Sequence, residues 1–86
     1  MMVVELFHAP GCKKCEQAQA DLKAVALRAV DGLEWRELNV LDALDYAVEL
    51  GVLTLPAIAI DRKLVFTALP TPEQLRKALI RTLGEA

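Results

Sequence analysis

The chain has 86 residues, of which 55% are hydrophobic and 26% charged, and its formal net charge is −2 at pH 7. This length suits one domain with a single core, and the composition is far from that of a disordered chain. The slightly acidic balance argues against a nucleic-acid-binding protein, which usually presents a basic face. The Lys and Arg residues are scattered among acids, so they form no polybasic patch for a membrane surface.

The first ten residues, MMVVELFHAP, lack both the basic stretch and the long apolar stretch of a secretory signal peptide. No apolar run reaches the length of about 20 residues that a membrane-spanning helix needs. We therefore expect a cytoplasmic protein with no membrane partner. In a reducing cytosol, a lone pair of cysteines is more often catalytic or metal-binding than a permanent disulfide.

The first half of the chain predicts a strand, a long helix and a second strand. Residues 2–8 are β-branched and apolar and end at the turn-forming Ala9-Pro10-Gly11, which predicts a buried strand. Residues from 13 onward are good helix formers, and Asp31-Gly32 is a suitable end for this helix. Residues 33–40 alternate between apolar and polar and predict a strand near an edge of the sheet. The expected buried face of the helix consists of Cys15, Ala18, Leu22, Val25 and Ala29.

The second half predicts a short helix, a hairpin and a final helix. Asp42 is a candidate N-cap for the short helix, in which Ala43, Ala47 and Leu50 share a face and after which Gly51 stands. Residues 57–60 and 63–67 are separated by two residues only, which predicts an antiparallel hairpin. The final helix begins with a capping box of Thr71 and Gln74, with Pro72 at its first position. Its expected buried stripe is Leu75, Ala78, Leu79 and Leu83.

The predicted fold is a single α/β domain over residues 1–86 with the order β-α-β-α-β-β-α. A strand–helix–strand unit pairs its strands in parallel through a right-handed crossover, and the closing hairpin adds antiparallel strands. The sequence therefore predicts a four-stranded mixed sheet with helices on both faces.

Cys12 and Cys15, the only cysteines, lie where the first strand gives way to the long helix. The free N–H groups and positive partial charge of a helix N-terminus stabilise a thiolate at Cys12. Such sites lower a thiol pKa from about 8.5 to about 3.5–7.5. Lys13 and Lys14 are candidates for tuning the pKa further in the same direction, with a modest effect if water screens them.

An exposed, acidified thiol followed by a shielded one is the arrangement that disulfide exchange requires. Cys15 shares the expected buried face, so we expect it to be the more shielded thiol. Other interpretations stay open at this point, including two inert thiols, a Cu(I) site, and a zinc site between two chains. A structural zinc site needs four ligands, and His8 is the only side chain that could supplement the cysteines without carboxylates.

A second motif, Thr54-Leu55-Pro56, stands between the short helix and the hairpin. Only about 5–6% of X-Pro bonds in folded proteins are cis, so the residues alone leave the isomer open.

The two motifs and the order of the elements resemble the thioredoxin/glutaredoxin superfamily along essentially the whole chain. The resemblance implies that Cys12 is the nucleophile and Cys15 the resolving thiol. It also implies a substrate-binding site at Thr54, Leu55 and Pro56, in which a cis Pro56 faces the cysteines. The backbone of Leu55 would pair there with a substrate chain as a short antiparallel strand.

This chain differs from thioredoxins at several positions of the motif. The segment Gly11-Cys12-Lys13-Lys14-Cys15 lacks the aromatic residue and the proline that thioredoxins carry beside the cysteines. Thioredoxins also have a buried acid six residues before the first cysteine, and this position is Leu6 here. The neighbouring Glu5 is expected to point to the other side of its strand, because side chains alternate along a strand.

We therefore expect a monomeric thiol–disulfide oxidoreductase that needs no bound cofactor. Its substrate would be a disulfide-containing protein or small molecule, and its electrons would come from an external reductase or thiol donor. The alternative is a metal-binding or redox-sensing adaptor of the same fold that uses the cysteine pair without turnover.

Overall fold

The computed structural model describes residues 2–9 and 13–84, and only the backbone of residues 13–15. The elements follow the predicted order, and none of the described helices is long and apolar enough to cross a membrane. They are β1 (Val3–His8), α1 (Lys13–Ala29), β2 (Glu34–Asn39), α2 (Leu44–Leu50), β3 (Ala57–Ile60), β4 (Lys63–Phe66) and α3 (Pro72–Gly84).

The four strands form one mixed sheet in the order β2-β1-β3-β4. β1 pairs in parallel with β2 and antiparallel with β3, and β3 and β4 form the predicted hairpin. The prediction that the second strand lies at an edge is confirmed. β1 is central, and Val4, Leu6 and Phe7 on its two faces are fully buried, as expected of a strand covered on both sides.

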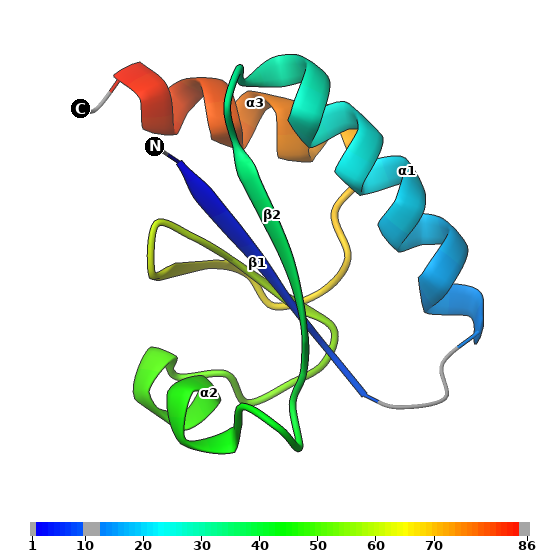
Figure 1. Ribbon diagram of the computed structural model, residues 1–86, viewed down its shortest axis with the longest axis vertical. Coiled ribbons are helices and arrows are strands. Elements are labelled where there is room, and N and C mark those ends of the chain that lie inside the picture. The colour runs from blue at the N-terminus through cyan, green and yellow to red at the C-terminus, as the bar shows by residue number, and fades with distance from the viewer. Residues whose placement is uncertain (1, 10–12, 85–86) are drawn as a thin grey trace.

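Helices cover both faces of the sheet, as predicted (Figure 1). α1 and α3 cover one face, where Leu6 and Ile58 pack with the inward side chains of both helices. α2 covers the other face, where Phe7 packs with small side chains such as Ala47 and Ala57. The first face carries the larger core, and the second carries a smaller one that is completed by polar contacts.

The buried stripe of α1 differs from the predicted one. Leu22 is buried as expected, but Ala18 and Val25 are only partly buried, whereas Gln19 and Ala26 are buried. The stripe is thus displaced by about one residue around the helix. The reason is that α1 packs against α3 as well as the sheet, a neighbour that periodicity within α1 does not reveal.

The end of α3 also departs from the expected pattern. Leu75 and Leu79 are buried, but Leu83 is 48% exposed. The half-buried position in the last turn belongs to Thr82, whose hydroxyl donates to the carbonyl of Ala78 at 2.9 Å. The predicted capping box is confirmed at the other end, where Thr71 and Gln74 exchange reciprocal hydrogen bonds of 2.9 and 3.2 Å.

The start of α2 shows that the N-cap assigned to Asp42 is wrong. Ala43 occupies the N-cap position and makes no side-chain capping bond. The preceding turn is held by Asn39 instead, whose side-chain oxygen accepts from the N–H of Leu41 at 3.0 Å. Its carbonyl accepts from the N–H of Asp42, also at 3.0 Å. Gly51 ends the helix in a left-handed conformation with φ of 86°, as the sequence predicts.

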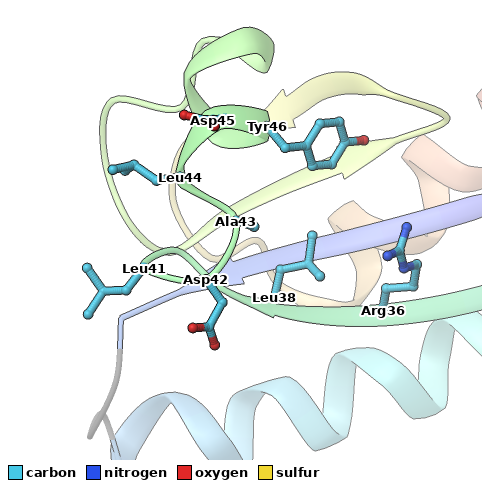
Figure 2. A pocket seen from close by; sticks show the side chains of 8 residues that line it. All are labelled: Arg36, Leu38, Leu41, Asp42, Ala43, Leu44, Asp45 and Tyr46. Carbon is cyan, nitrogen blue, oxygen red and sulfur yellow. The ribbon is translucent and has the colours of Figure 1, made fainter.

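β2, this turn and α2 enclose an open groove of about 480 Å³ (Figure 2). Its floor includes Arg36 and Leu38 from β2, and its outer rim includes Leu41, Asp42 and Leu44. Tyr46 also lines the groove, and its ring lies over the sheet, whereas Leu41 and Leu44 project in the opposite direction.

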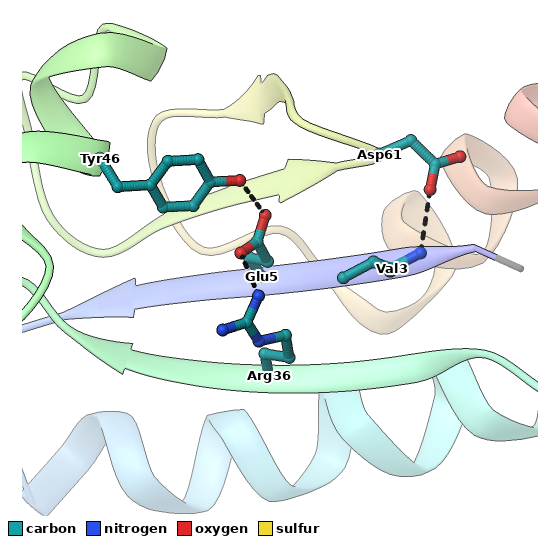
Figure 3. Close-up of polar contacts among 5 residues, drawn as sticks. All are labelled: Val3, Glu5, Arg36, Tyr46 and Asp61. Carbon is teal, nitrogen blue, oxygen red and sulfur yellow. Dashed lines mark hydrogen bonds and ion pairs between the residues drawn. The ribbon is translucent and has the colours of Figure 1, made fainter.

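A buried carboxylate joins α2 to the sheet beneath it (Figure 3). Glu5 is 1% exposed and lies on the α2 side of β1, as its place in the strand predicts. The hydroxyl of Tyr46 donates to one of its carboxylate oxygens. Arg36 Nη1 donates to the other at 3.2 Å. The carboxylate therefore has partners on both oxygens, as a buried charge requires.

Burial and the hydrogen bond to Glu5 raise the pKa of Tyr46 above its usual value of 10.0. The nearby Arg36 and Arg62 act in the opposite direction. The protonated Tyr46 hydroxyl therefore stabilises the folded protein. Because the folded-state pKa is raised, this contribution is complete below the unfolded pKa of about 10 and is lost as the pH rises through the folded pKa.

We predict that Tyr46→Phe lowers the free energy of unfolding at neutral pH by about 1–3 kcal/mol, because the Glu5 carboxylate loses a donor. The variant should also lose less stability than the wild type above about pH 10. Urea titrations at several pH values measure both effects. Tyr46 is the only tyrosine, so its phenolate absorbance reports its pKa directly. Equal loss of stability by the two proteins on the alkaline side would contradict the role of Tyr46.

Candidate functional site

The register of the sheet brings the end of β1 and the start of β3 to one edge. Phe7 of β1 lies opposite Ala57 of β3 in the antiparallel pair. One residue further, His8 ends β1 and Pro56 precedes β3. The chain that leads to Cys12 therefore leaves the sheet beside the Leu55-Pro56 step, although the two motifs are more than forty residues apart in sequence.

Four of the predicted site residues lie wholly or partly outside the described part of the chain. Cys12 lies outside the described residues, and so do the side chains of Lys13, Lys14 and Cys15. What the structure describes is the backbone beside them. α1 begins at Lys13, directly after Cys12 in the sequence, and runs for 17 residues. Cys12 is therefore the residue that immediately precedes the N-terminus of a long helix.

The peptide bond between Leu55 and Pro56 is cis, as the resemblance implies. Leu55 is 38% exposed. Among the described residues, neither its N–H nor its C=O has a hydrogen-bond partner. A donor and an acceptor on exposed backbone are what a further strand needs in order to pair there.

Thr54, the third member of this motif, has a partner within the protein. Its hydroxyl donates to the carbonyl of Thr67 at 2.8 Å. Thr67 directly follows β4, so the bond ties the loop before Pro56 to the far end of the hairpin. The hydroxyl proton is used in this bond, which leaves Thr54 to hold the loop rather than to donate to a substrate.

His8 is half-buried at the end of β1. Its Nδ1 lies 3.4 Å from the carbonyl of Ala9. Its own carbonyl accepts from the N–H of Val40 at 3.0 Å. These contacts belong to a residue at the end of a strand, and the bond from Val40 brings the end of β2 to the same edge as the end of β1.

Two features of this region do not follow from the sequence interpretation above. The first is the set of bonds that Tyr46 and Arg36 make to the buried Glu5. The only hint of it in the sequence is an acid inside an apolar strand. The second is the outer surface of α2, where Leu44 and Val48 are 55% and 69% exposed. The sequence predicts Ala47 on the buried side of this helix, so the exposed side could have been predicted from the helical period. Among the described residues, which exclude Cys12 and the side chain of Cys15, no three His, Cys, Asp or Glu are grouped to hold a metal ion.

Comparison with known proteins identifies one family. The family model described as "Thioredoxin domain" matches residues 2–80. Thioredoxin from Methanocaldococcus jannaschii is 32% identical over 80 residues, which are 93% of this chain and 94% of that protein. A probable thioredoxin from Methanothermobacter thermautotrophicus is 26% identical over 76 residues, which are 88% of this chain and 89% of that protein.

Solved structures show the same fold. A mutant thioredoxin from Halobacterium salinarum superposes with a TM-score of 0.76 at 19% identity, covering 93% of this chain and 73% of that one. Thioredoxin from Fasciola hepatica gives a TM-score of 0.72 at 21% identity, covering 93% and 79%. The family match over nearly the whole chain, the archaeal relative and the strand order agree. The chain therefore belongs to the thioredoxin family and is, in general terms, a thiol–disulfide oxidoreductase.

Proposed function

We propose that the protein reduces or exchanges disulfides through a Cys12–Cys15 pair whose two thiols have unequal roles. The Cys12 thiolate attacks one sulfur of a substrate disulfide and forms a mixed disulfide, and the other substrate sulfur leaves and takes up a proton. The Cys15 thiolate then attacks Cys12, which closes the Cys12–Cys15 disulfide and releases the second substrate thiol. The substrate gains two electrons, and an external reductase or thiol donor returns them to the pair.

The single observation that supports this proposal is that the end of β1, from which the chain leads to Cys12, lies beside the Leu55-Pro56 step at one edge of the sheet. β1 and β3 are paired up to Phe7 and Ala57. The residues that follow β1 lead to Cys12, and those that precede β3 are Leu55 and Pro56. A disulfide held along the Leu55 backbone would thus lie beside the end of β1, from which the chain leads to Cys12.

The start of α1 supports the role of Cys12 as the attacking thiol. A residue directly before a helix of 17 residues is next to unpaired backbone N–H groups, which favour a thiolate over a thiol. Lys13 and Lys14 add positive charge in the same direction.

The phase of α1 supports the role of Cys15 as the shielded thiol. Cys15 lies one helical turn before Gln19, which is 7% exposed. Leu22 and Ala26 continue the same buried stripe. A resolving thiol needs to reach Cys12 while remaining inaccessible to other disulfides, and a position at the head of this stripe fits that need.

The first test separates the roles of the two cysteines. Cys15→Ser should accumulate a mixed disulfide with a peptide disulfide, because the intermediate can form but cannot be resolved. Cys12→Ser should accumulate far less, because it lacks the attacking thiol. Mass spectrometry under non-reducing conditions measures both adducts. Equal trapping by the two variants would show that the roles are assigned wrongly.

The second test addresses Thr54. Thr54→Val keeps the shape of the side chain but removes the donor to Thr67, at a net cost of about 1 kcal/mol, or about fivefold in an equilibrium. We expect the KM for a peptide disulfide to rise by about this factor while kcat changes less, because the loop binds substrate and does not react.

The conservative variant Thr54→Ser is the matched control, because it keeps the hydroxyl. Both variants are assayed with the same dithiol reductant at a fixed concentration. Restoration of the wild-type KM by Thr54→Ser would support the bond to Thr67. A Thr54→Val protein with an unchanged KM would contradict it.

A further inference from the structure

Exposed hydrophobic side chains gather in one short part of the chain. Among the described residues, nine large hydrophobic side chains are exposed, and five of them lie between residues 41 and 55. Scattered exposed hydrophobic residues are ordinary, but a cluster of them marks a surface that binds something. The five are Leu41, Leu44, Val48, Leu53 and Leu55.

The outer face of α2 combines two kinds of side chain. Leu44 and Val48 are four residues apart and therefore neighbours on the helix surface. Asp45 and Glu49 form a second exposed pair beside them. Ala47 is the buried residue of the helix, so the apolar pair and the acidic pair both face away from the sheet. This face presents an apolar ridge next to a negatively charged one.

The turn before α2 extends this face into the groove of Figure 2. Leu41 is 67% exposed, and its side chain projects to the same side as Leu44 in that view. Asp42 of the same turn is also exposed, but its carboxylate points away from α2 in that view. The cation that lines the groove, Arg36, is paired with the buried Glu5 at 3.2 Å. Because Glu5 balances the charge of Arg36, the remaining charged groups that line the groove are the carboxylates of Asp42 and Asp45.

This face begins beside the end of β1. The N–H of Val40 donates to the carbonyl of His8 at 3.0 Å, where β1 ends. Leu41 is the next residue after Val40, so the exposed face begins at the edge from which the chain leads to Cys12. A partner whose disulfide reached that edge would bring its flanking residues over α2.

We propose that the outer face formed by Leu41, Leu44, Asp45, Val48 and Glu49, hereafter the α2 surface, docks an apolar and basic segment of the protein that carries the substrate disulfide. The inference rests on the proposed function and adds the class of partner. Apolar side chains of the segment cover Leu41, Leu44 and Val48, while its Lys or Arg side chains meet the carboxylates of Asp45 and Glu49. A second copy of this chain is a poor occupant, because a two-fold contact would set acidic ridges against each other.

The test compares three disulfides in single-turnover reactions with the pre-reduced protein at low salt. Two are peptides with one intramolecular disulfide and the same leucines, flanked by lysines in one and by glutamates in the other. The third is bis(2-hydroxyethyl) disulfide, which is small and uncharged. We expect the basic peptide to be reduced about tenfold faster than the acidic one, with a ratio that falls as salt is added.

Two sets of variants locate the preference on α2. Asp45→Asn with Glu49→Gln should lower the ratio of basic to acidic rates by about threefold. Leu44→Ser with Val48→Ser should slow both peptides by a similar factor and leave the small disulfide unchanged. Asp31→Asn with Glu34→Gln is the charge control, because it removes two exposed carboxylates from the opposite end of the sheet. Ile80→Ser, at an α3 side chain that is 47% exposed, controls for loss of surface hydrophobicity.

The outcomes separate this inference from the proposed function. Reduction of the small disulfide with equal rates for the two peptides would overturn the docking surface and leave the redox role intact. A control pair that changes the ratio as much as the α2 pair does would also overturn the docking surface alone. A wild-type protein that reduces none of the three disulfides would overturn the proposed function, and the inference with it.

Discussion

The antiparallel pairing of β1 with β3 is the constraint on which the rest of the structure depends. It places β1 in the middle of the sheet, between β2 and β3, where helices cover both of its faces. This position explains why Val4, Leu6 and Phe7 are all fully buried. The same register brings the end of β1 beside the start of β3. The Leu55-Pro56 step that precedes β3 therefore lies at the same edge as the end of β1, from which the chain continues toward Cys12. β2 extends the edge through the bond between Val40 and His8.

Around this edge, the proposed functions are divided among different elements. The start of α1 would supply the reactive pair, and the loop before β3 would hold the substrate backbone. α2 would choose among partners through its outer face, while its inner face is fixed to the sheet by Tyr46 and Glu5. In this proposal the chemistry would reside in one helix and the partner contacts in another, so changes on α2 would alter which disulfides are reduced without altering how they are reduced.

The sequence predicted best what is decided locally. The capping box at Thr71, the two-residue hairpin turn and the glycine at the end of α2 were all predictable, because each is set by residues within a few positions. The Asp42 cap was not, because Asn39 holds the turn from the preceding strand. The bond between Thr54 and Thr67 and the contacts of Glu5 join residues 13 to 41 positions apart. Periodicity does not contain such pairings, and the buried stripe of α1 shifted for the same reason.

The central claim is that Cys12 and Cys15 are one redox pair, and a titration of the protein against dithiol–disulfide buffers of graded potential tests it most directly. Alkylation followed by mass spectrometry counts the free thiols at each potential. The proposed pair predicts one two-electron transition between a form with two free thiols and a form with an intramolecular Cys12–Cys15 disulfide. A protein that retains both free thiols across the series, or oxidises only by linking two chains, would contradict it.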